Sequence, residues 1–208
     1  MQRFLKILKW TGISFAGLFI VGAIGITIFL WILSDGLPDT DKLANYEPPV
    51  TTRVHAGNGT LIAEFAEERR LFVPIASIPE RVRGAFLSAE DKNFYIHPGI
   101  DPMGIARALI DNAWNAIQGT GKRPEGASTI TQQVAKNFFL SNEVSYARKI
   151  QEMLLAFKLE GTYSKDKILE LYLNEIFLGQ NAYGVAAAAL VYFNKSLDEL
   201  TVAEAAYL

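Results

Sequence analysis

The chain lacks cysteine entirely and holds only two histidines, His55 and His97, among its 208 residues. The first absence excludes disulfide bonds, thiolate nucleophiles and zinc sites built on thiolates. The second excludes a histidine-rich metal centre, so any metal would have to be a hard cation on carboxylates or on substrate phosphate. The formal net charge of −2 argues against a general nucleic-acid-binding protein. Carboxylates, amides, hydroxyls and basic side chains remain as the groups that could carry chemistry.

Charge is also absent from residues 10–33, WTGISFAGLFIVGAIGITIFLWIL. At ~1.5 Å per residue this run is roughly 36 Å long, enough to cross a hydrocarbon core of about 30 Å. Trp10 and Trp31 stand near its two ends, where indole rings favour the headgroup region. The alternative is a cleaved signal peptide, but its apolar region is usually about 7–15 residues long and ends at a small-x-small site. The sequence therefore predicts an uncleaved transmembrane anchor.

The charges on the two sides of this run differ in sign. Basic residues precede it and acidic residues follow it: Arg3, Lys6 and Lys9, then Asp35, Asp39 and Asp41. The positive-inside rule puts residues 1–9 in the cytoplasm as a short tail and everything after residue 34 outside. Residues 34–50 are rich in Pro and Asp, which predicts an extended linker. Residues 51–208, roughly 160 residues, are enough for one domain with a core of its own.

The first part of this domain predicts a small β region. TTRVHAGNGTLIAEF has two alternating runs around Asn58-Gly59, a pair that favours a type I′ hairpin turn. RRLFVPI is expected to add a third strand. From residue 77 onward the pattern is helical, and Ser77 with Glu80 indicates a capping box at the first helix start. The apolar face of this helix comprises Val82, Ala85, Phe86 and Ala89.

Further helices follow along the chain. They are predicted over 102–117, from Ser128 onward, over 145–160, over 165–177 with Ser164 as its cap, in AYGVAAAALVYF, and from Thr201 onward, where Thr201 and Glu204 indicate a capping box. The segment 118–128 is expected to be a mobile loop because it is rich in glycine. Ile110, Trp114 and Ile117 share one side of their helix, which predicts either a face that dips into the membrane leaflet or a buried core face. The chain stops inside its last helix at Leu208, so we expect it to be part of a longer protein.

Glu90, in SAEDKNFYIHPGID, follows Val82 and Phe86 along one helix and lies at the edge of the apolar face. A carboxylate there is expected to be partly desolvated, with Asp91 beside it as a like charge, and this setting suits a general base. The alternative is an ordinary solvated acidic pair, although the helix dipole disfavours carboxylates at a C-terminus. His97 precedes a proline and is expected to hydrogen-bond the turn rather than to act in catalysis.

The stretch GASTITQQVAKN begins the next polar helix. Its polar side chains are Gln132, Gln133, Lys136 and Asn137, stacked in pairs one turn apart. Amides recognise sugar hydroxyls well, and the helix start at Ser128 and Thr129 is a natural site for an anion. A capped surface helix without function is the alternative.

The stretch RKIQE places Arg148 and Glu152 one turn apart, opposite an apolar face of the same helix. That face comprises Ile150, Met153, Leu154 and Phe157. The pair is either an ordinary helix salt bridge worth about 0.3–0.5 kcal/mol or part of a larger cationic cluster. This cluster would comprise Arg148, Lys149 and Lys136 with one acid inside it, and would suit a diphosphate.

Taken in order, several stretches resemble the peptidoglycan glycosyltransferase domain (family 51) of class A penicillin-binding proteins and their monofunctional relatives. They are EDKNFYIHPGID, GASTITQQVAKN, RKIQEMLLAFKLE, KDKILELYLNEIFLGQNAYG and LTVAEAAYL. The resemblance covers residues 70–208. The preceding TTRVHAGNGTLIAEF is more similar to the bifunctional class A proteins, in which a transpeptidase domain, absent from this chain, would follow.

The resemblance implies a mainly α, lysozyme-like glycosyltransferase fold with a small membrane-proximal lobe, a short β-hairpin region and one N-terminal transmembrane helix. It implies Glu90 as the general base and Glu152 as the second essential acid. Substrate contacts are implied for Asp91, Phe94, His97, Gly99, Ser128, Gln132, Gln133, Lys136, Asn137, Arg148 and Lys149.

The resemblance also implies a reaction, in which lipid II is added to a glycan strand on polyprenyl diphosphate. Glu90 would deprotonate the acceptor hydroxyl, while Lys136, Arg148 and Lys149 would stabilise the departing diphosphate. No cofactor is expected to be tightly bound, and Mg²⁺ or Mn²⁺ is a candidate partner of the diphosphate near Glu152. The implied location is the bacterial inner membrane with the catalytic domain outside. Membrane lipids and other cell-wall synthesis proteins are the expected partners.

Two rival functions stay open. A lysozyme-like hydrolase or lytic transglycosylase would cleave a sugar–sugar bond with the help of a protonated acid, and the cationic cluster would then have no purpose. An inactive, membrane-tethered scaffold of the cell-wall machinery would tolerate substitution of Glu90.

Overall fold

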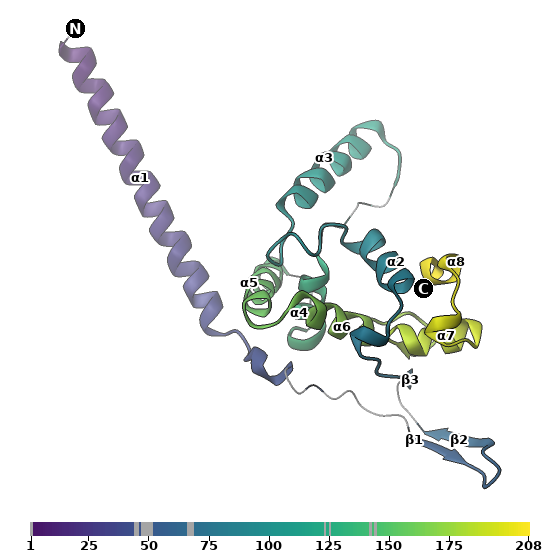
Figure 1. Ribbon diagram of the computed structural model, residues 1–208. Coiled ribbons are helices and arrows are strands. Elements are labelled where there is room, and N and C mark those ends of the chain that lie inside the picture. The colour runs from purple at the N-terminus through teal and green to yellow at the C-terminus, as the bar shows by residue number, and fades with distance from the viewer. Residues whose placement is uncertain are drawn as a thin grey trace.

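Helices carry most of the chain in the computed structural model, which describes residues 2–43, 46, 52–65, 69–122, 124, 126–141, 143 and 145–208 (Figure 1). The α-helices of these residues are α1 (Gln2–Asp35), α2 (Glu80–Glu90), α3 (Pro102–Gln118), α4 (Ile130–Phe139), α5 (Tyr146–Thr162), α6 (Lys165–Glu175), α7 (Val185–Phe193) and α8 (Val202–Tyr207). The 3₁₀ helices are η1 (Thr40–Leu43), η2 (Ile75–Ser77) and η3 (Leu197–Glu199). The strands are β1 (Thr52–His55), β2 (Leu61–Phe65), β3 (Arg69–Arg70) and β4 (Ala182–Tyr183). The prediction of a mainly α fold with a short hairpin and one apolar N-terminal helix is confirmed.

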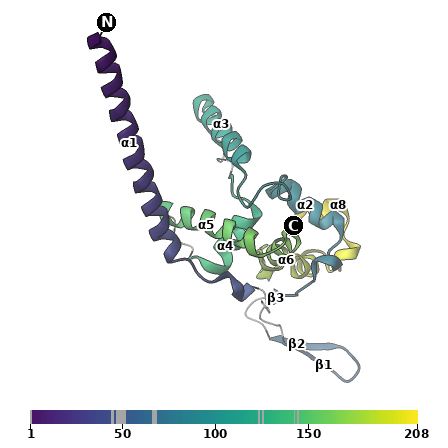
Figure 2. The same cartoon turned by 60° about the vertical axis from the view of Figure 1, so that its left-hand side comes forward.

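The helix α1 contains the apolar run. Its Lys9–Asp35 part is long and apolar enough to cross a membrane, judged by length and composition. Phe15 and Phe19 of this part are 77 % and 78 % exposed. Figures 1 and 2 show α1 leaving the helical body, with only its C-terminal end close to α5. An uncovered apolar helix of this length is suited to lipid, as predicted for residues 10–33.

The segment after α1 docks onto the helical body. Thr40 and Leu43 of η1 are buried, the latter in the main core. Lys158 of α5 and Tyr163, directly after α5, donate hydrogen bonds to backbone carbonyls of this segment, at 3.1 and 2.7 Å. The prediction of an extended linker over 34–50 is therefore wrong for its first half, because Leu43 enters the core and α5 supplies donors to the segment's carbonyls.

The strands β1 and β2 form the predicted antiparallel hairpin, but its turn differs from the prediction. The N–H of Gly59 donates to the Ala56 carbonyl at 2.9 Å, which makes Gly57 and Asn58 the central residues of the turn. Of these residues only Gly59 has a positive φ, 84°. A type I′ turn needs positive φ at both central residues, so the predicted type I′ turn is wrong. Gly59 instead occupies the bulge position that closes a three-residue loop.

The third strand exists but belongs to another sheet. β3 lies parallel to β4 and away from the hairpin. Arg70 explains this pairing, since its guanidinium binds the Glu175 carboxylate and lies 4.4 Å from the centre of the Tyr183 ring. The expectation that RRLFVPI extends the hairpin sheet is therefore wrong, because these contacts attach it to the segment after α6.

Two of the three predicted capping residues stand at helix starts in the structure. The side chain of Ser164 caps α6, and Thr201 opens the capping box of α8. The start of α2 is different, since this helix begins at Glu80 after Pro79 and has no side-chain cap. Ser77 instead ends the 3₁₀ helix η2, so the predicted capping box of Ser77 and Glu80 is wrong.

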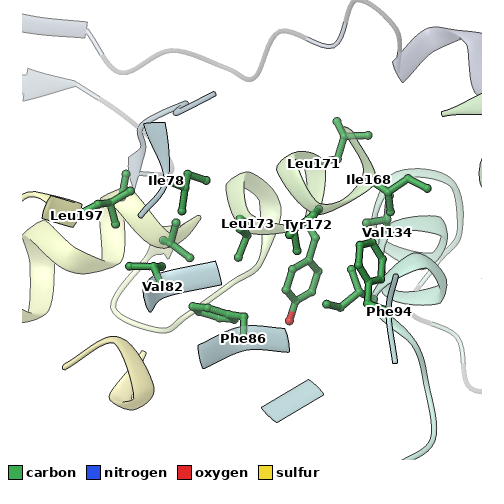
Figure 3. Packing of buried hydrophobic residues seen from close by; sticks show 14 of the residues in the cluster. Ile78, Val82, Phe86, Phe94, Val134, Ile168, Leu171, Tyr172, Leu173 and Leu197 are labelled. Atoms are coloured by element: carbon green, nitrogen blue, oxygen red, sulfur yellow. The ribbon is translucent and has the colours of Figure 1, made fainter. Parts of the chain in front are cut away.

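One apolar core lies among α2, α4, α5, α6 and α7. Figure 3 shows its centre, where Tyr172 of α6 extends between Phe86 and Phe94. Val82 and Phe86 of α2 are buried as predicted, whereas Ala89 at the end of the same face is exposed. The last turn of α2 therefore projects beyond the core.

The helix α5 buries a different face from the one predicted. Its buried residues are Glu152, Leu155, Ala156 and Leu159. Residues of the predicted face are only half-buried, and Phe157 is 49 % exposed. The predicted apolar face of α5 is therefore wrong. The reason is that α5 has apolar residues on two sides, and the side that packs also carries Glu152, whose charge is paired by Arg148 and Lys149 of the same helix.

The helix α3 stands apart from the other helices and forms a small lobe. Asp101 caps it by accepting the N–H groups of Met103 and Gly104, and these contacts, that of Gly104 foremost, lower the pKa of the Asp101 carboxyl. Trp114 and Ile117 are 60 % and 79 % exposed, so they are not a core face. Figures 1 and 2 show that α3 and the N-terminal part of α1 extend from the same side of the body.

Candidate active site

A polar pocket of about 220 Å³ lies between the end of α2, the start of α3 and the start of α4. Its lining includes Glu90, Asp91, Lys92, Arg107, Ser128 and Thr129. These residues come from three stretches that are far apart in the sequence. The pocket therefore unites the first two predicted functional stretches.

Glu90 is the last residue of α2 and stands at the exposed rim of this pocket. Its Oε2 accepts a hydrogen bond from Gln133 Nε2 of α4 at 2.8 Å. The partial desolvation predicted for this carboxylate is wrong, because α2 leaves the core after Phe86 and its last turn faces the pocket. Glu90 is thus accessible to a substrate, and one amide fixes its direction.

Asp91, the neighbour of Glu90, is buried and has a different environment. Its two carboxylate oxygens lie 2.9 and 3.0 Å from His97 Nε2, and Oδ2 also accepts the N–H of Ile130 at 3.0 Å. Gly99 N–H donates to His97 Nδ1 at 3.2 Å, which fits the tautomer whose Nε2 carries the proton. Asp91 therefore joins the end of α2 to the start of α4, and the structural role predicted for His97 fits this geometry.

The other predicted contacts from this loop lie behind the pocket. Phe94 is fully buried, with Lys165 Nζ 4.4 Å from the centre of its ring. Gly99 has φ 95°, and its carbonyl accepts the Thr129 hydroxyl at 2.6 Å. A Cβ on Gly99 would come within 3.0 Å of the Ala156 carbonyl oxygen. Because Phe94, His97 and Gly99 are buried, they support the pocket from behind and are not proposed to contact substrate.

The start of α4 is already occupied by protein groups. Thr129 and Gln132 form a capping box in which Gln132 Oε1 accepts the Thr129 N–H at 3.0 Å. The Asp91 carboxylate takes the next N–H, that of Ile130. The predicted anion site at this helix N-terminus is therefore wrong, because Asp91 is itself the anion there. Gln132 is 2 % exposed and is also left out, whereas Gln133, Lys136 and Asn137 remain accessible in part.

Glu152 of α5 is only 2 % exposed, and two cations hold it. Arg148 Nη1 lies 2.6 Å from Oε1, and Lys149 Nζ lies 2.7 Å from Oε2. Lys149 Nζ also donates to Ser128 Oγ at 2.7 Å, and Ser128 lines the pocket. The structure thus joins the third predicted functional stretch to the same site through Ser128.

Comparison with known proteins identifies the family. Residues 58–208 match the sequence model of the transglycosylase family. The chain belongs to the transglycosylase family. The resemblance inferred from the sequence stretches is thereby confirmed.

Curated relatives of this chain are named penicillin-binding protein 1A. The one from Rickettsia felis is 53 % identical over 195 residues, which cover 93 % of this chain and 24 % of the relative. The one from Neisseria gonorrhoeae is 47 % identical over 194 residues, with the same two coverages of 93 % and 24 %. The chain therefore spans about a quarter of the length of these curated relatives. Among solved structures, penicillin-binding protein 1A from Haemophilus influenzae is 28 % identical to this chain, with a TM-score of 0.33. The match covers 77 % of this chain and 13 % of the Haemophilus influenzae chain.

The pocket has two basic residues that the sequence analysis missed. Lys92 follows the two acids directly, and Arg107 projects from the first half of α3. Arg107 is the only basic residue of α3, a signal that was visible in the sequence. The pocket therefore has cationic side chains on the α3 side as well as beyond Ser128.

The donor set around Glu152 does not fit a metal ion held by the protein. Both of its carboxylate oxygens are taken by Arg148 and Lys149. Within the described residues no three acidic or histidine side chains gather where they could hold a metal ion. Glu152 is therefore not proposed as a ligand of Mg²⁺ or Mn²⁺.

Proposed function

We propose that this chain is an inverting peptidoglycan glycosyltransferase that polymerises lipid II into glycan strands and releases polyprenyl diphosphate. The observation that carries the proposal is the accessible Glu90 in a polar pocket, with the Arg148–Lys149–Glu152 cluster joined to that pocket through Ser128. Membership of the transglycosylase family supports it.

Glu90 acts as the general base in this proposal. Its carboxylate takes the proton of the GlcNAc 4-hydroxyl of the acceptor while that oxygen attacks the anomeric carbon of the donor. A carbon–oxygen bond forms between the two sugars, the bond from the anomeric carbon to the diphosphate breaks, and the configuration inverts from α to β. Gln133 leaves one carboxylate oxygen of Glu90 open on the pocket rim, where an acceptor hydroxyl can reach it.

The leaving group is an anion and needs positive charge more than a proton. Arg148, Lys149 and Lys136 supply this charge in the proposal, and Glu152 holds the first two side chains in place. The Arg148 side chain is 17 % exposed, so part of its guanidinium group is accessible to a ligand. Arg107 and Lys92 add positive charge on the α3 side of the pocket.

Both substrates of the proposed reaction are lipid-linked, which agrees with the two uncovered apolar surfaces. α1 would anchor the chain with its N-terminus in the cytoplasm, and the pocket would then lie outside the inner membrane. The exposed side chains Ile110, Trp114 and Ile117 of α3 would enter the leaflet and guide the prenyl chain.

The test is polymerisation by the full chain in lipid vesicles that contain lipid II, with the products separated by size on a gel. Wild type is expected to form long glycan strands, and Glu90→Gln to lose about 10²–10⁴-fold in rate, the usual contribution of a general base. Glu80→Gln, at the exposed other end of α2, is the matched control and should keep wild-type rate.

Each rival function predicts another result in this assay. A glycan-cleaving enzyme would shorten preformed strands instead of extending them. An inactive scaffold would form no polymer in any variant. Polymerisation by Glu90→Gln at wild-type rate would remove Glu90 from the mechanism while leaving the family intact.

A further inference from the structure

Tyr172 of α6 carries a buried hydroxyl that neither the capping motifs nor the proposed chemistry uses. The residue is 1 % exposed, and its hydroxyl oxygen has no hydrogen-bond partner within the described residues. Its ring packs edge-on against Phe86, with the two centroids 6.2 Å apart. Figure 3 shows the hydroxyl pointing from α6 toward α2, the helix that ends at Glu90. A buried donor without an acceptor costs free energy and asks for an explanation.

Two carboxylates lie near enough to Tyr172 to affect it. Burial first, then the charges of Glu90 and Asp91, raise the pKa of the Tyr172 hydroxyl, which therefore stays protonated and able to donate. Asp91 is already engaged, because His97 and the N–H of Ile130 occupy its oxygens. Glu90 accepts only the hydrogen bond from Gln133 among the contacts of the described residues, at Oε2. Its Oε1 is thus the acceptor with free capacity.

We propose that Tyr172 is a positioning residue for Glu90, and that its hydroxyl donates a hydrogen bond to the Glu90 carboxylate when that side chain turns inward over Phe86 to receive the acceptor's proton. Gln133 and Tyr172 then hold the two carboxylate oxygens from α4 and α6. This inference rests on the proposed function, because it assigns a role to Tyr172 in the step that Glu90 performs there.

The inward position has a consequence for the dependence of the rate on pH. A hydrogen bond donated to a carboxylate favours its charged form, which is the form that accepts a proton. Losing it should move the acidic limb of the pH–rate profile to higher pH. The charged groups that line the pocket with Glu90 are Asp91 and Lys92 beside it and Asp101 and Arg107 across it. A second pocket lined by Glu90 also contains Ala205 and Ala206 of α8 and Leu208 after it, whose side chains are uncharged.

The experiment compares wild type with Tyr172→Phe in the lipid II polymerisation assay across a range of pH. The variant keeps the ring that packs on Phe86 and removes only the hydroxyl. We expect its kcat to fall about tenfold, its KM to stay constant and the acidic limb to move up by about one pH unit, the size expected for a hydrogen bond to a charged group. We also expect an unchanged or higher Tm, because the hydroxyl lacks a partner in this structure.

Tyr192→Phe is the matched control, because the Tyr192 hydroxyl donates to the Leu178 carbonyl at 2.7 Å. It should lower Tm and leave the pH profile in place. The inference is overturned if Tyr172→Phe keeps the wild-type kcat and pH profile, or if its kcat falls only together with Tm. Failure of wild type to polymerise lipid II would instead refute the proposed function, so the two failures are distinguishable.

Discussion

The two glutamates of the site occupy opposite environments. Glu90 stands on an exposed rim and receives one hydrogen bond from a neutral amide. Glu152 is almost fully buried and is held by a guanidinium and an ammonium group. A carboxylate that must take a proton needs access and some freedom to move, whereas a carboxylate that organises cations needs burial and fixed partners. In the proposed mechanism, this difference assigns proton transfer to Glu90 and the positioning of the cations to Glu152.

The largest expected effect on stability is that of Glu152→Gln. Removing one member of a buried ion cluster leaves Arg148 and Lys149 without their counter-ion, so the free energy of unfolding should fall by about 2–4 kcal/mol. Urea unfolding followed by circular dichroism measures it. Glu90→Gln is the comparison and should stay within about 0.5 kcal/mol of wild type, as an exposed site does. Equal losses in the two variants would contradict the division of roles.

Asp91→Asn should cost less, about 1–2 kcal/mol, because it weakens the bond to His97 and removes the anion from the start of α4. Thermal unfolding is the measurement. Asp91 is adjacent to Glu90 in the sequence but is buried like Glu152. The variant therefore also tests whether this acid supports the fold, as its burial indicates, or takes part in the reaction. A stability equal to wild type combined with lost activity would make Asp91 part of the chemistry instead of the support.

Gln133→Ala should affect activity and leave stability unchanged. Without the amide, Glu90 loses its fixed direction, and we expect kcat for lipid II polymerisation to fall about tenfold, the value of one good hydrogen bond to a charged group. The free energy of unfolding should change by less than about 0.5 kcal/mol because Glu90 is exposed. Glu80→Gln, at the exposed other end of α2, is again the control and should keep the wild-type kcat. A normal kcat in Gln133→Ala would mean that other groups orient the base.

The smallest expected effect concerns Glu204, a glutamate that is partly buried and ion-paired. Its hydrogen bond to Lys195, followed by the capping bond at Thr201, lowers its pKa from 4.5 to about 2. The carboxyl therefore contributes stability that is complete above about pH 4.5 and is lost as the pH falls toward 2. Thermal unfolding of Glu204→Gln should show a smaller loss of Tm over that window than wild type does. An unchanged acid dependence would show that this cap does not stabilise α8.

Local signals in the sequence predicted several features well. The caps at Ser164 and Thr201 and the extent of α3 follow from short-range chemistry, and so does the apolar run of α1. Features that depend on tertiary packing were predicted less well. Arg70 directed its strand to β4, and the apolar face chosen for α5 was not the one that packs.

The sequence by itself determined the helices, the apolar anchor and the family stretches that hold the two glutamates, because periodicity, capping and motif order are local properties of the chain. Only the tertiary structure decided the environment of each acid. Whether a carboxylate is exposed on a rim or buried among cations depends on which helices surround it. The sequence places both glutamates on predicted helices. In the structure, α2 leaves the core before Glu90, whereas α5 packs with Glu152 on its buried face.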